Sequence, residues 1–254
     1  MAPWPPNGLD SGFLMLKHAL SAWFRAGLRE LLPCACAVCG AVQRELVCAG
    51  CMDDLAPLLG RRRCIQCAIA LETRHLARHC HACLVGAPDF DATVTLADYG
   101  WPLDHLVTGL KFRGQLPLAG WLAGRLGEAL RAAPGRLPDV LVPVPLAPAR
   151  LRLRGYNQAW EIARRLEGQL QIAALPTALQ RVRDNPAQAT LDRAERLANL
   201  HGAFVVAEPA RIAGRHVGVV DDVMTTGTTL GEIATQLKRA GALRVTNVVA
   251  LRTP

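Results

Sequence analysis

The chain has 254 residues, of which 51% are hydrophobic and 20% are charged, so it can bury a sizeable core and is too apolar for a disordered tail. It carries 29 Lys and Arg against 21 Asp and Glu, and this net charge of +8 permits an anionic partner such as nucleic acid or a phosphorylated metabolite. No lysine precedes Ser or Thr, no two glycines are separated by a single residue, and no serine follows Ser21. These absences exclude a Walker A loop, a G-x-G dinucleotide fingerprint and a G-x-S-x-G hydrolase.

Residues 1–33 form an N-terminal extension in which apolar side chains recur at helical spacing from Phe13 to Leu32, which predicts an amphipathic helix. Lys17 and Arg25 interrupt its apolar stretch, so we expect neither a signal peptide nor a membrane span. Without an export signal the expected location is the cytoplasm, where thiols stay reduced.

All nine cysteines lie between Cys34 and Cys83, and this segregation predicts a cysteine module over 34–87 followed by a second domain over 88–254. Cys34 is left over. The other eight form four C-x-x-C pairs: Cys36 and Cys39, Cys48 and Cys51, Cys64 and Cys67, and Cys80 and Cys83.

The four pairs predict two structural zinc ions. One C-x-x-C turn supplies half of a tetrahedron of thiolates, and two such turns complete a four-cysteine zinc site. Sequential pairing gives two zinc ribbons; crossed pairing is the alternative, which the short connecting loops disfavour. Disulfides conflict with a reducing compartment, and thioredoxin-like motifs rarely occur in four copies without a βαβ context. A module this small has almost no apolar core, so the metal would supply much of its folding energy.

From Phe90 onward, apolar runs alternate with helical stretches, which predicts an α/β fold with a mostly parallel sheet. The expected strands are Ala92–Ala97, Val140–Val144, Ala203–Val206, His216–Val220 and Val245–Leu251. The expected helices are Leu103–Lys111, Leu116–Arg131, Gln158–Leu170 and Thr229–Ala240. The charged stretch Asp184–Asn199 is expected to be a long loop or a short surface helix.

The segment from Val217 to Thr229 reads V-G-V-V-D-D-V-M-T-T-G-T-T and carries the strongest functional signal. An apolar strand leads into Asp221 and Asp222, and a hydroxyl-rich loop then opens a helix. Backbone N–H groups, hydroxyls and a helix N-terminus suit a phosphate dianion, whereas the acids suit sugar hydroxyls or Mg²⁺. The pattern therefore predicts a site for a ribose 5′-phosphate; the alternative is a plain helix cap. The loop residues are Thr225, Thr226, Gly227, Thr228 and Thr229.

A second segment places arginines after the strand that ends in V-P-V-P-L. Its sequence from position 150 is R-L-R-L-R-G-Y-N-Q, and guanidinium groups there would suit pyrophosphate, because Arg–phosphate pairs are strong. The alternative is a solvated basic loop. The candidate pyrophosphate residues are Val144, Pro145, Leu146, Arg152 and Arg154.

The segment from Val217 to Thr229 closely resembles the 5-phosphoribosyl-1-pyrophosphate (PRPP) motif of type I phosphoribosyltransferases. By that resemblance, Asp221 and Asp222 hold the ribose 2′ and 3′ hydroxyls, and 225–229 cradle the 5′-phosphate. With L-L-P before Cys36, K-F-R-G at 111–114 and R-x-R-G-Y-N-Q at 152–158, the chain beyond its first thirty residues resembles the ComF family. Cys34 and the N-terminal extension depart from that family's pattern.

The ComF resemblance implies a link to natural competence, through uptake or processing of single-stranded DNA, and to the use of DNA as a nutrient. One hypothesis is a phosphoribosyltransferase that uses Mg²⁺-PRPP and an unidentified nitrogen acceptor. No residue is evident as its general base, and Glu161 and Asp98 are the only suggestions. The other hypothesis is a non-catalytic accessory protein whose zinc ribbons and Arg-rich loop contact single-stranded DNA or a DNA-uptake helicase.

Overall fold

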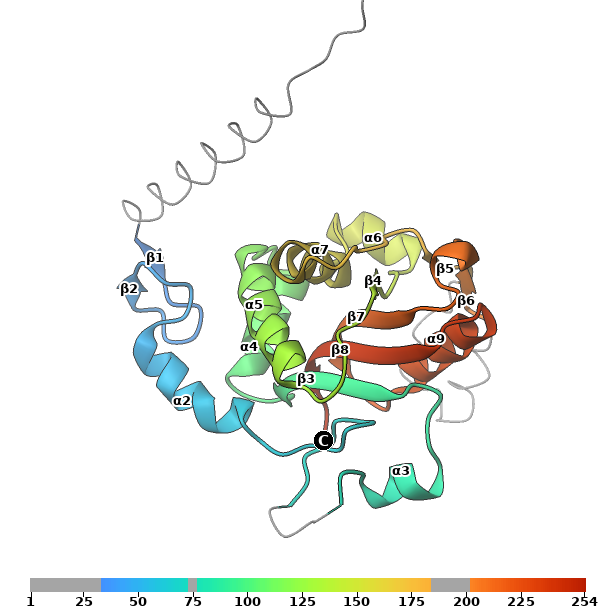
Figure 1. Cartoon of the computed structure of the whole chain (residues 1–254). Coiled ribbons are helices and arrows are strands. Elements are labelled where there is room, and N and C mark those ends of the chain that lie inside the picture. Colours follow the sequence, from blue (N-terminus) through green and yellow to red (C-terminus); the bar gives the residue numbers. More distant parts are fainter. Residues whose placement is uncertain (1–32, 73–76, 184–201) are drawn as a thin grey trace, which may run out of the picture. The chain divides into compact units, whose positions relative to one another are not determined.

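The computed structural model describes residues 33–72, 77–183 and 202–254 (Figure 1). The expected N-terminal helix and the stretch from Asp184 to Asn199 lie outside these ranges. The chain divides into two compact units, one ending at Met52 and the other running from Asp53 to Pro254. The third and fourth cysteine pairs, at 64–83, therefore belong to the same unit as the sheet that follows them.

The first unit is built around a short antiparallel pair, β1 (Cys34–Ala35) and β2 (Val42–Gln43), with α2 (Ala49–Leu59) beginning next to the second cysteine pair. The turn between the strands closes when the Gly40 N–H donates to the Cys36 carbonyl at 2.9 Å. Gly40 has a φ of +77°, a left-handed conformation that favours glycine, which explains why glycine follows Cys39.

The second unit is centred on a sheet of four parallel strands in the order β3-β8-β7-β4 (Figure 1). These strands are β3 (Ala92–Asp98), β4 (Val140–Pro143), β7 (His216–Met224) and β8 (Arg244–Arg252). The sheet confirms the predicted α/β class, and the continuous apolar runs are explained by strands that are covered on both faces. Since all four strands run in the same direction, their carboxyl ends meet at one edge, where open α/β sheets place their ligands.

Helices cover both faces of this sheet. On one face, α5 (Pro117–Ala132) and α7 (Gln158–Leu170) pack on each other, α5 against β3 and β8, and α7 against β7 and β4. The shorter α4 (Leu103–Phe112) packs beside α5. On the other face, Val217 and Val219 share a buried cluster with Ile233 and Leu237 of α9 (Thr228–Arg239). No described helix combines the length and the hydropathy that crossing a bilayer requires.

Smaller elements complete the second unit. The expected strand near 203–206 forms as β6 (Phe204–Val206), but it pairs antiparallel with the unpredicted β5 (Leu179–Arg181) and lies outside the parallel sheet. Two further short elements were also absent from the sequence prediction, namely α3 (His81–Val85) and a 3₁₀ turn at Pro209–Arg211.

The Arg-rich loop expected after β4 is in fact a helix, α6 (Pro148–Arg154). Pro148 stands in its first turn, and Gly155, with a φ of +81°, ends it. The sequence analysis predicted no helix here, yet the Pro and Gly at the ends of the segment define a helix of two turns. Residues four apart lie on one side of a helix and residues two apart lie on opposite sides, so Arg150 and Arg154 share a side that excludes Arg152.

Candidate functional site

The acidic pair lies inside β7, which continues past the predicted end at Val220 to Met224. Asp222 is buried and Asp221 is half-buried. The Lys111 ammonium contacts Asp222 Oδ1 at 2.9 Å, while Asp222 Oδ2 is buried and has no hydrogen-bond partner. The Asp222 backbone N–H donates to Asp221 Oδ1 at 2.8 Å. Two adjacent carboxyl groups thus share one neighbouring cation, and one of their oxygens is buried without a hydrogen-bond partner.

Burial and the neighbouring Asp222 carboxyl raise the pKa of Asp221 to about 8, although Lys111 and the Asp222 N–H act in the opposite direction. In the ligand-free protein Asp221 therefore retains a proton at neutral pH. A ligand or cation that favours the ionised carboxylate would displace this proton on binding.

The loop after β7 has the geometry of an oxygen-rich turn at a helix start. Gly227 has a φ of +81° and directly precedes α9. A Cβ atom on residue 227 would lie 2.6 Å from Met224 Cε. The hydroxyls of Thr226 and Thr228 are hydrogen-bonded at 2.7 Å. The sequence therefore requires glycine here for both the conformation and the close approach, and the helix N-terminus adds a positive dipole end.

A cavity of about 790 Å³ opens at the carboxyl edge of the sheet. It brings together the acidic pair, Thr229 and the strand-end segment from Val144 to Leu146 with Arg154. Arg152 does not line it, because α6 turns this residue to the opposite side. The rest of the predicted phosphate loop lines a second cavity of about 660 Å³ instead; these residues are Thr225, Thr226, Gly227 and Thr228.

The larger cavity also contains cationic and aromatic residues outside the candidate site residues named above: Lys111, Phe112, Arg150, Tyr156 and Arg181. Lys111 is one of only three lysines in the chain, and it belongs to the K-F-R-G segment that marked the family resemblance. The scarcity of lysine could therefore have pointed to Lys111 as a candidate site residue. Arg181 comes from the unpredicted β5 and had no such signal.

Arg154 and Asn157 organise one wall of this cavity. The Arg154 guanidinium donates to Gln158 Oε1 and lies 5.4 Å from the Phe112 ring centroid, which holds the charge over an aromatic face. The Asn157 side chain caps α7 by accepting from the Ala159 N–H at 2.9 Å, and its Nδ2 donates to the Val144 carbonyl at 2.9 Å. The start of α7 is thereby fixed to the end of β4.

Neither suggested general base lies in the cavity. Glu161 accepts from Arg164 and Arg165 at 2.5 Å and 2.6 Å, and although burial opposes them, these hydrogen bonds lower its pKa. Asp98 accepts from Arg61 and Arg63 at 3.2 Å and 2.6 Å. Both carboxylates therefore serve ion pairs rather than a ligand.

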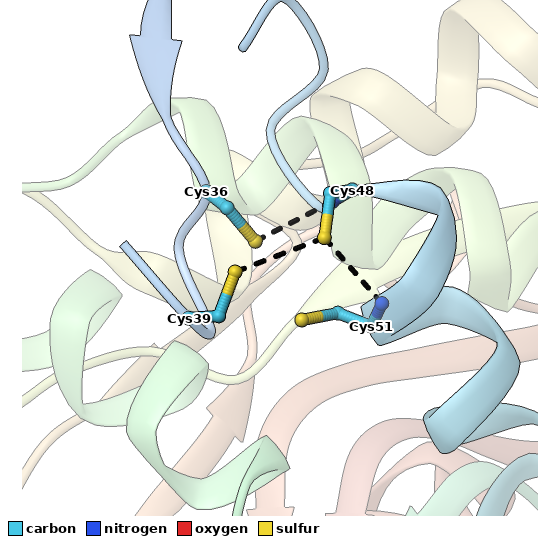
Figure 2. Close-up of side chains that lie close together, drawn as sticks. All are labelled: Cys36, Cys39, Cys48 and Cys51. Carbon is cyan, nitrogen blue, oxygen red and sulfur yellow. Dashed lines mark hydrogen bonds between the residues drawn. The ribbon is translucent and has the colours of Figure 1, made fainter. Parts of the chain in front are cut away.

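The first cysteine cluster gathers Cys36, Cys39, Cys48 and Cys51, whose sulfurs all lie within 4.8 Å of one another (Figure 2). The sulfurs of Cys39 and Cys48 are 3.8 Å apart. A tetrahedral zinc ion with Zn–S bonds of about 2.3 Å places its sulfurs ~3.8 Å apart. Burial raises the pKa of the Cys36 thiol, but N–H groups of the turns outweigh it and lower this pKa to about 6. The cluster thus favours a thiolate and fits zinc.

The second cluster joins Cys64, Cys67, Cys80 and Cys83 in the same way. The sulfurs of Cys67 and Cys80 are 3.6 Å apart, and the Cys80 N–H points at Cys64 Sγ at 3.3 Å. Sequential pairing is therefore the observed one, and none of the nine cysteines, all of which are described, is in a disulfide. Cys34 stays outside both clusters, and its thiol donates to the Glu45 carbonyl at 3.4 Å.

Arg252 connects the second cluster to the phosphate-type loop. Its buried guanidinium donates from Nε to the Cys67 carbonyl at 3.0 Å and from Nη1 to the Thr225 carbonyl. On the other side of the cluster, the Thr93 hydroxyl of β3 donates to the Gln66 carbonyl at 2.6 Å. The zinc-type knuckle is therefore hydrogen-bonded to both the sheet and the loop.

Comparison with known proteins gives no matching family model but finds close relatives by sequence. Competence protein F of Haemophilus influenzae is 34% identical over 205 residues, which cover 79% of this chain and 87% of the relative. This chain belongs to the ComF (competence protein F) family. A second relative, the DNA utilization protein YhgH of Escherichia coli, is 37% identical over 186 residues, covering 72% of this chain and 80% of that protein.

A shorter similarity links this ComF-family chain to an orotate phosphoribosyltransferase of Acinetobacter baumannii, 38% identical over 80 residues, which cover 32% of this chain and 36% of that enzyme. The ComF-family chain is an α/β protein whose four-stranded parallel sheet is preceded in the sequence by a four-cysteine cluster that fits a zinc ribbon.

Proposed function

We propose that this ComF-family protein binds PRPP together with Mg²⁺ in the cavity at the carboxyl edge of the sheet. The observation that carries the proposal is the convergence there of two carboxyl groups, the first turn of α9 and an arginine-bearing helix face. The acids match ribose hydroxyls. Thr229 and the helix N-terminus match a 5′-phosphate, and Arg150, Arg154 and Lys111 match pyrophosphate.

The donor set fits Mg²⁺. This ion prefers oxygen ligands and is usually held by one or two carboxylates plus substrate phosphates. Asp221 and Asp222 offer such oxygens, and the unpartnered Asp222 Oδ2 is a buried acceptor without a donor. When bound, the ion would neutralise charge on the pyrophosphate, and Lys111 would remain the protein's own cation beside Asp222.

The chemistry best matched by these residues is displacement at C1′ of the ribose. The bond from C1′ to the pyrophosphate oxygen breaks with its electron pair, and an incoming nitrogen forms the new bond to C1′ and loses a proton. The arginines would stabilise the departing pyrophosphate, and the acidic pair would hold the ribose hydroxyls in place. No His or Glu lies among the described residues that line the cavity, so the proton acceptor on the nitrogen side is not assigned.

The names of the relatives support a role in the uptake or use of DNA, in which the phosphoribosyl site either performs a transfer or senses PRPP. A release assay separates these two roles. Pyrophosphate production from Mg²⁺-PRPP with a panel of nucleobases and amines supports an enzyme, and saturable PRPP binding without pyrophosphate supports the accessory role.

Calorimetric titration with Mg²⁺-PRPP tests the site itself. Arg154→Met is expected to weaken binding at least about tenfold, because it removes a charge-assisted contact to phosphate. Arg152→Met on the opposite side of α6 is the matched control and should bind like the parent. The double variant Asp221→Asn with Asp222→Asn should abolish binding. If this variant titrates with unchanged heats, the site assignment is wrong.

A further inference from the structure

A second charged cavity, of about 560 Å³, lies at the opposite edge of the sheet. Its wall includes the first residues of three parallel strands, Ala92 of β3, His216 of β7 and Arg244 of β8. The remainder comes from the end of α5 with the loop after it and from the segment around Cys64. All of these residues belong to the compact unit that begins at Asp53.

The charge in this cavity is one-sided. Five arginines line it and no Asp or Glu does; they are Arg61, Arg63, Arg78, Arg136 and Arg244. Arg78, Arg136 and Arg244 form no ion pair with any described carboxylate. Zinc with the four thiolates of the second cluster, to which Cys64 belongs, would carry a net charge of −2, and Asp98 beside Arg61 and Arg63 adds −1, so the five arginines still leave the cavity positive.

Arg63 is a second, independent observation, because it carries buried donors that no described residue accepts. Its side chain is only 10% exposed, and its Nη1 contacts Asp98 at 2.6 Å and the Ala68 carbonyl at 3.0 Å. Its Nε and Nη2 atoms are buried and have no hydrogen-bond partner. Buried guanidinium donors are normally satisfied, and planar pairs of N–H groups match phosphate oxygens.

The positive surface extends beyond this cavity. A smaller hollow of about 230 Å³ shares Arg136, Leu137, His216 and Arg244 with it, and its remaining lining residue is Asp139, whose carboxylate accepts from the His216 backbone N–H at 2.8 Å, so two arginines face one acid there. The His216 Nε2 atom is hydrogen-bonded to Thr246 Oγ1 at 2.8 Å. Burial and the neighbouring Arg244 lower the pKa of His216, which favours its neutral form, so the positive charge comes from the arginines. The site is therefore larger than one phosphate group requires.

We propose that the amino edge of the sheet is a second phosphate-binding site, separate from the PRPP cavity, which takes the phosphate groups of a nucleotide or of a nucleic-acid backbone. Its volume suits a mononucleotide-sized group, and guanidinium groups can bind its phosphates. The two ligand sources share this chemistry, and the length of the ligand distinguishes them.

The test uses the full-length, zinc-loaded protein and fluorescence anisotropy with a labelled oligothymidylate of about 12 nucleotides. The double variant Arg136→Glu with Arg244→Glu reverses two exposed, unpaired charges, so it should fold. Arg239→Glu, exposed on α9 and lining none of these cavities, is the control for a general charge effect. A second variant, Arg63→Lys, keeps a cation for Asp98 and removes the unpartnered donors. Parallel titrations use ATP and pyrophosphate as free ligands.

We expect the double variant to weaken oligonucleotide binding at least about tenfold relative to the Arg239→Glu control, and to reduce the dependence of log K on log[salt] by about two. Arg63→Lys should weaken it as well, and PRPP binding should be unchanged in every variant. ATP binding that is lost in the double variant, without oligonucleotide binding, would assign the site to free nucleotides. Equal weakening by the double variant and its control, or no phosphate ligand affected by either, would overturn the proposal, whatever the outcome for PRPP.

Discussion

Replacement of Lys111 by Met should destabilise the sheet unit, because it leaves the Asp222 carboxylate buried without its cation. The ammonium and Asp222 Oδ1 are 2.9 Å apart, and the aspartate side chain is only 4% exposed. At an effective dielectric constant of 20, this separation corresponds to about 6 kcal/mol of attraction, part of which offsets the cost of burying both charges. Removing one partner of a buried ion pair typically costs about 3–5 kcal/mol because the remaining charge is uncompensated, and the 22% exposure of the Lys111 side chain lowers this figure. We therefore expect a loss of about 2–4 kcal/mol.

Urea denaturation followed by far-UV circular dichroism at pH 7 measures this loss. The double variant Lys111→Met with Asp222→Asn should recover most of it, with a coupling free energy of at least about 1.5 kcal/mol, because the uncompensated charge is removed. Lys238→Met is the matched control: its ion pair with Asp91, at 3.0 Å, is more exposed and should contribute less than about 1 kcal/mol. A coupling below about 0.5 kcal/mol between positions 111 and 222 would show that the pair does not stabilise the buried carboxylate.

Three further outcomes are expected. The native state holds the Asp221 proton up to a pKa of about 8, against 3.8 for an ordinary aspartate, so stability should fall as pH rises between these values; Asp221→Asn should lack this decline, and equal pH profiles in urea denaturation would contradict it. Cys36→Ser and Cys64→Ser should each lower the zinc content by about one ion per chain in metal analysis, and Cys64→Ser should also lower the melting temperature of the sheet, since the second cluster is hydrogen-bonded to β3 and β8; an unchanged melting temperature would contradict this. Gly227→Ala should cost about 1–2 kcal/mol in urea denaturation because φ is +81°, whereas Gly231→Ala, with open space inside α9, should be neutral or slightly stabilising; the same cost at both positions would refute the strain argument.

Much of the sheet unit could be predicted from the sequence, because its strands and helices have strong, long patterns. The helix at Gln158–Leu170 has the predicted bounds, and the four strands of the parallel sheet begin within one residue of their expected starts. Periodicity is reliable here since each strand is covered on both faces. The two cysteine clusters follow from spacing alone, as the observed pairing is sequential.

The remainder depends on contacts that no local pattern encodes. The segment at 150–154 was interpreted as an Arg-rich loop, so the division of its arginines between two sides of a short helix was not predicted. The strand β7 extends through Asp221 and Asp222 because β8 continues to pair with it, with Val249 opposite Asp221. Lys111 and Arg181 reach the cavity only through tertiary packing.

The hydrogen bonds of Arg252 have a practical consequence for dissecting the molecule. A fragment that began after the last cysteine would lack two hydrogen-bond acceptors, the Cys67 carbonyl and the Gln66 carbonyl. The Arg252 guanidinium and the Thr93 hydroxyl, which donate to them, would each lose that partner. A fragment that began at Asp53 would retain every one of these partners. Expression trials, limited proteolysis and engineered fusions should therefore keep the second cysteine cluster together with the parallel sheet.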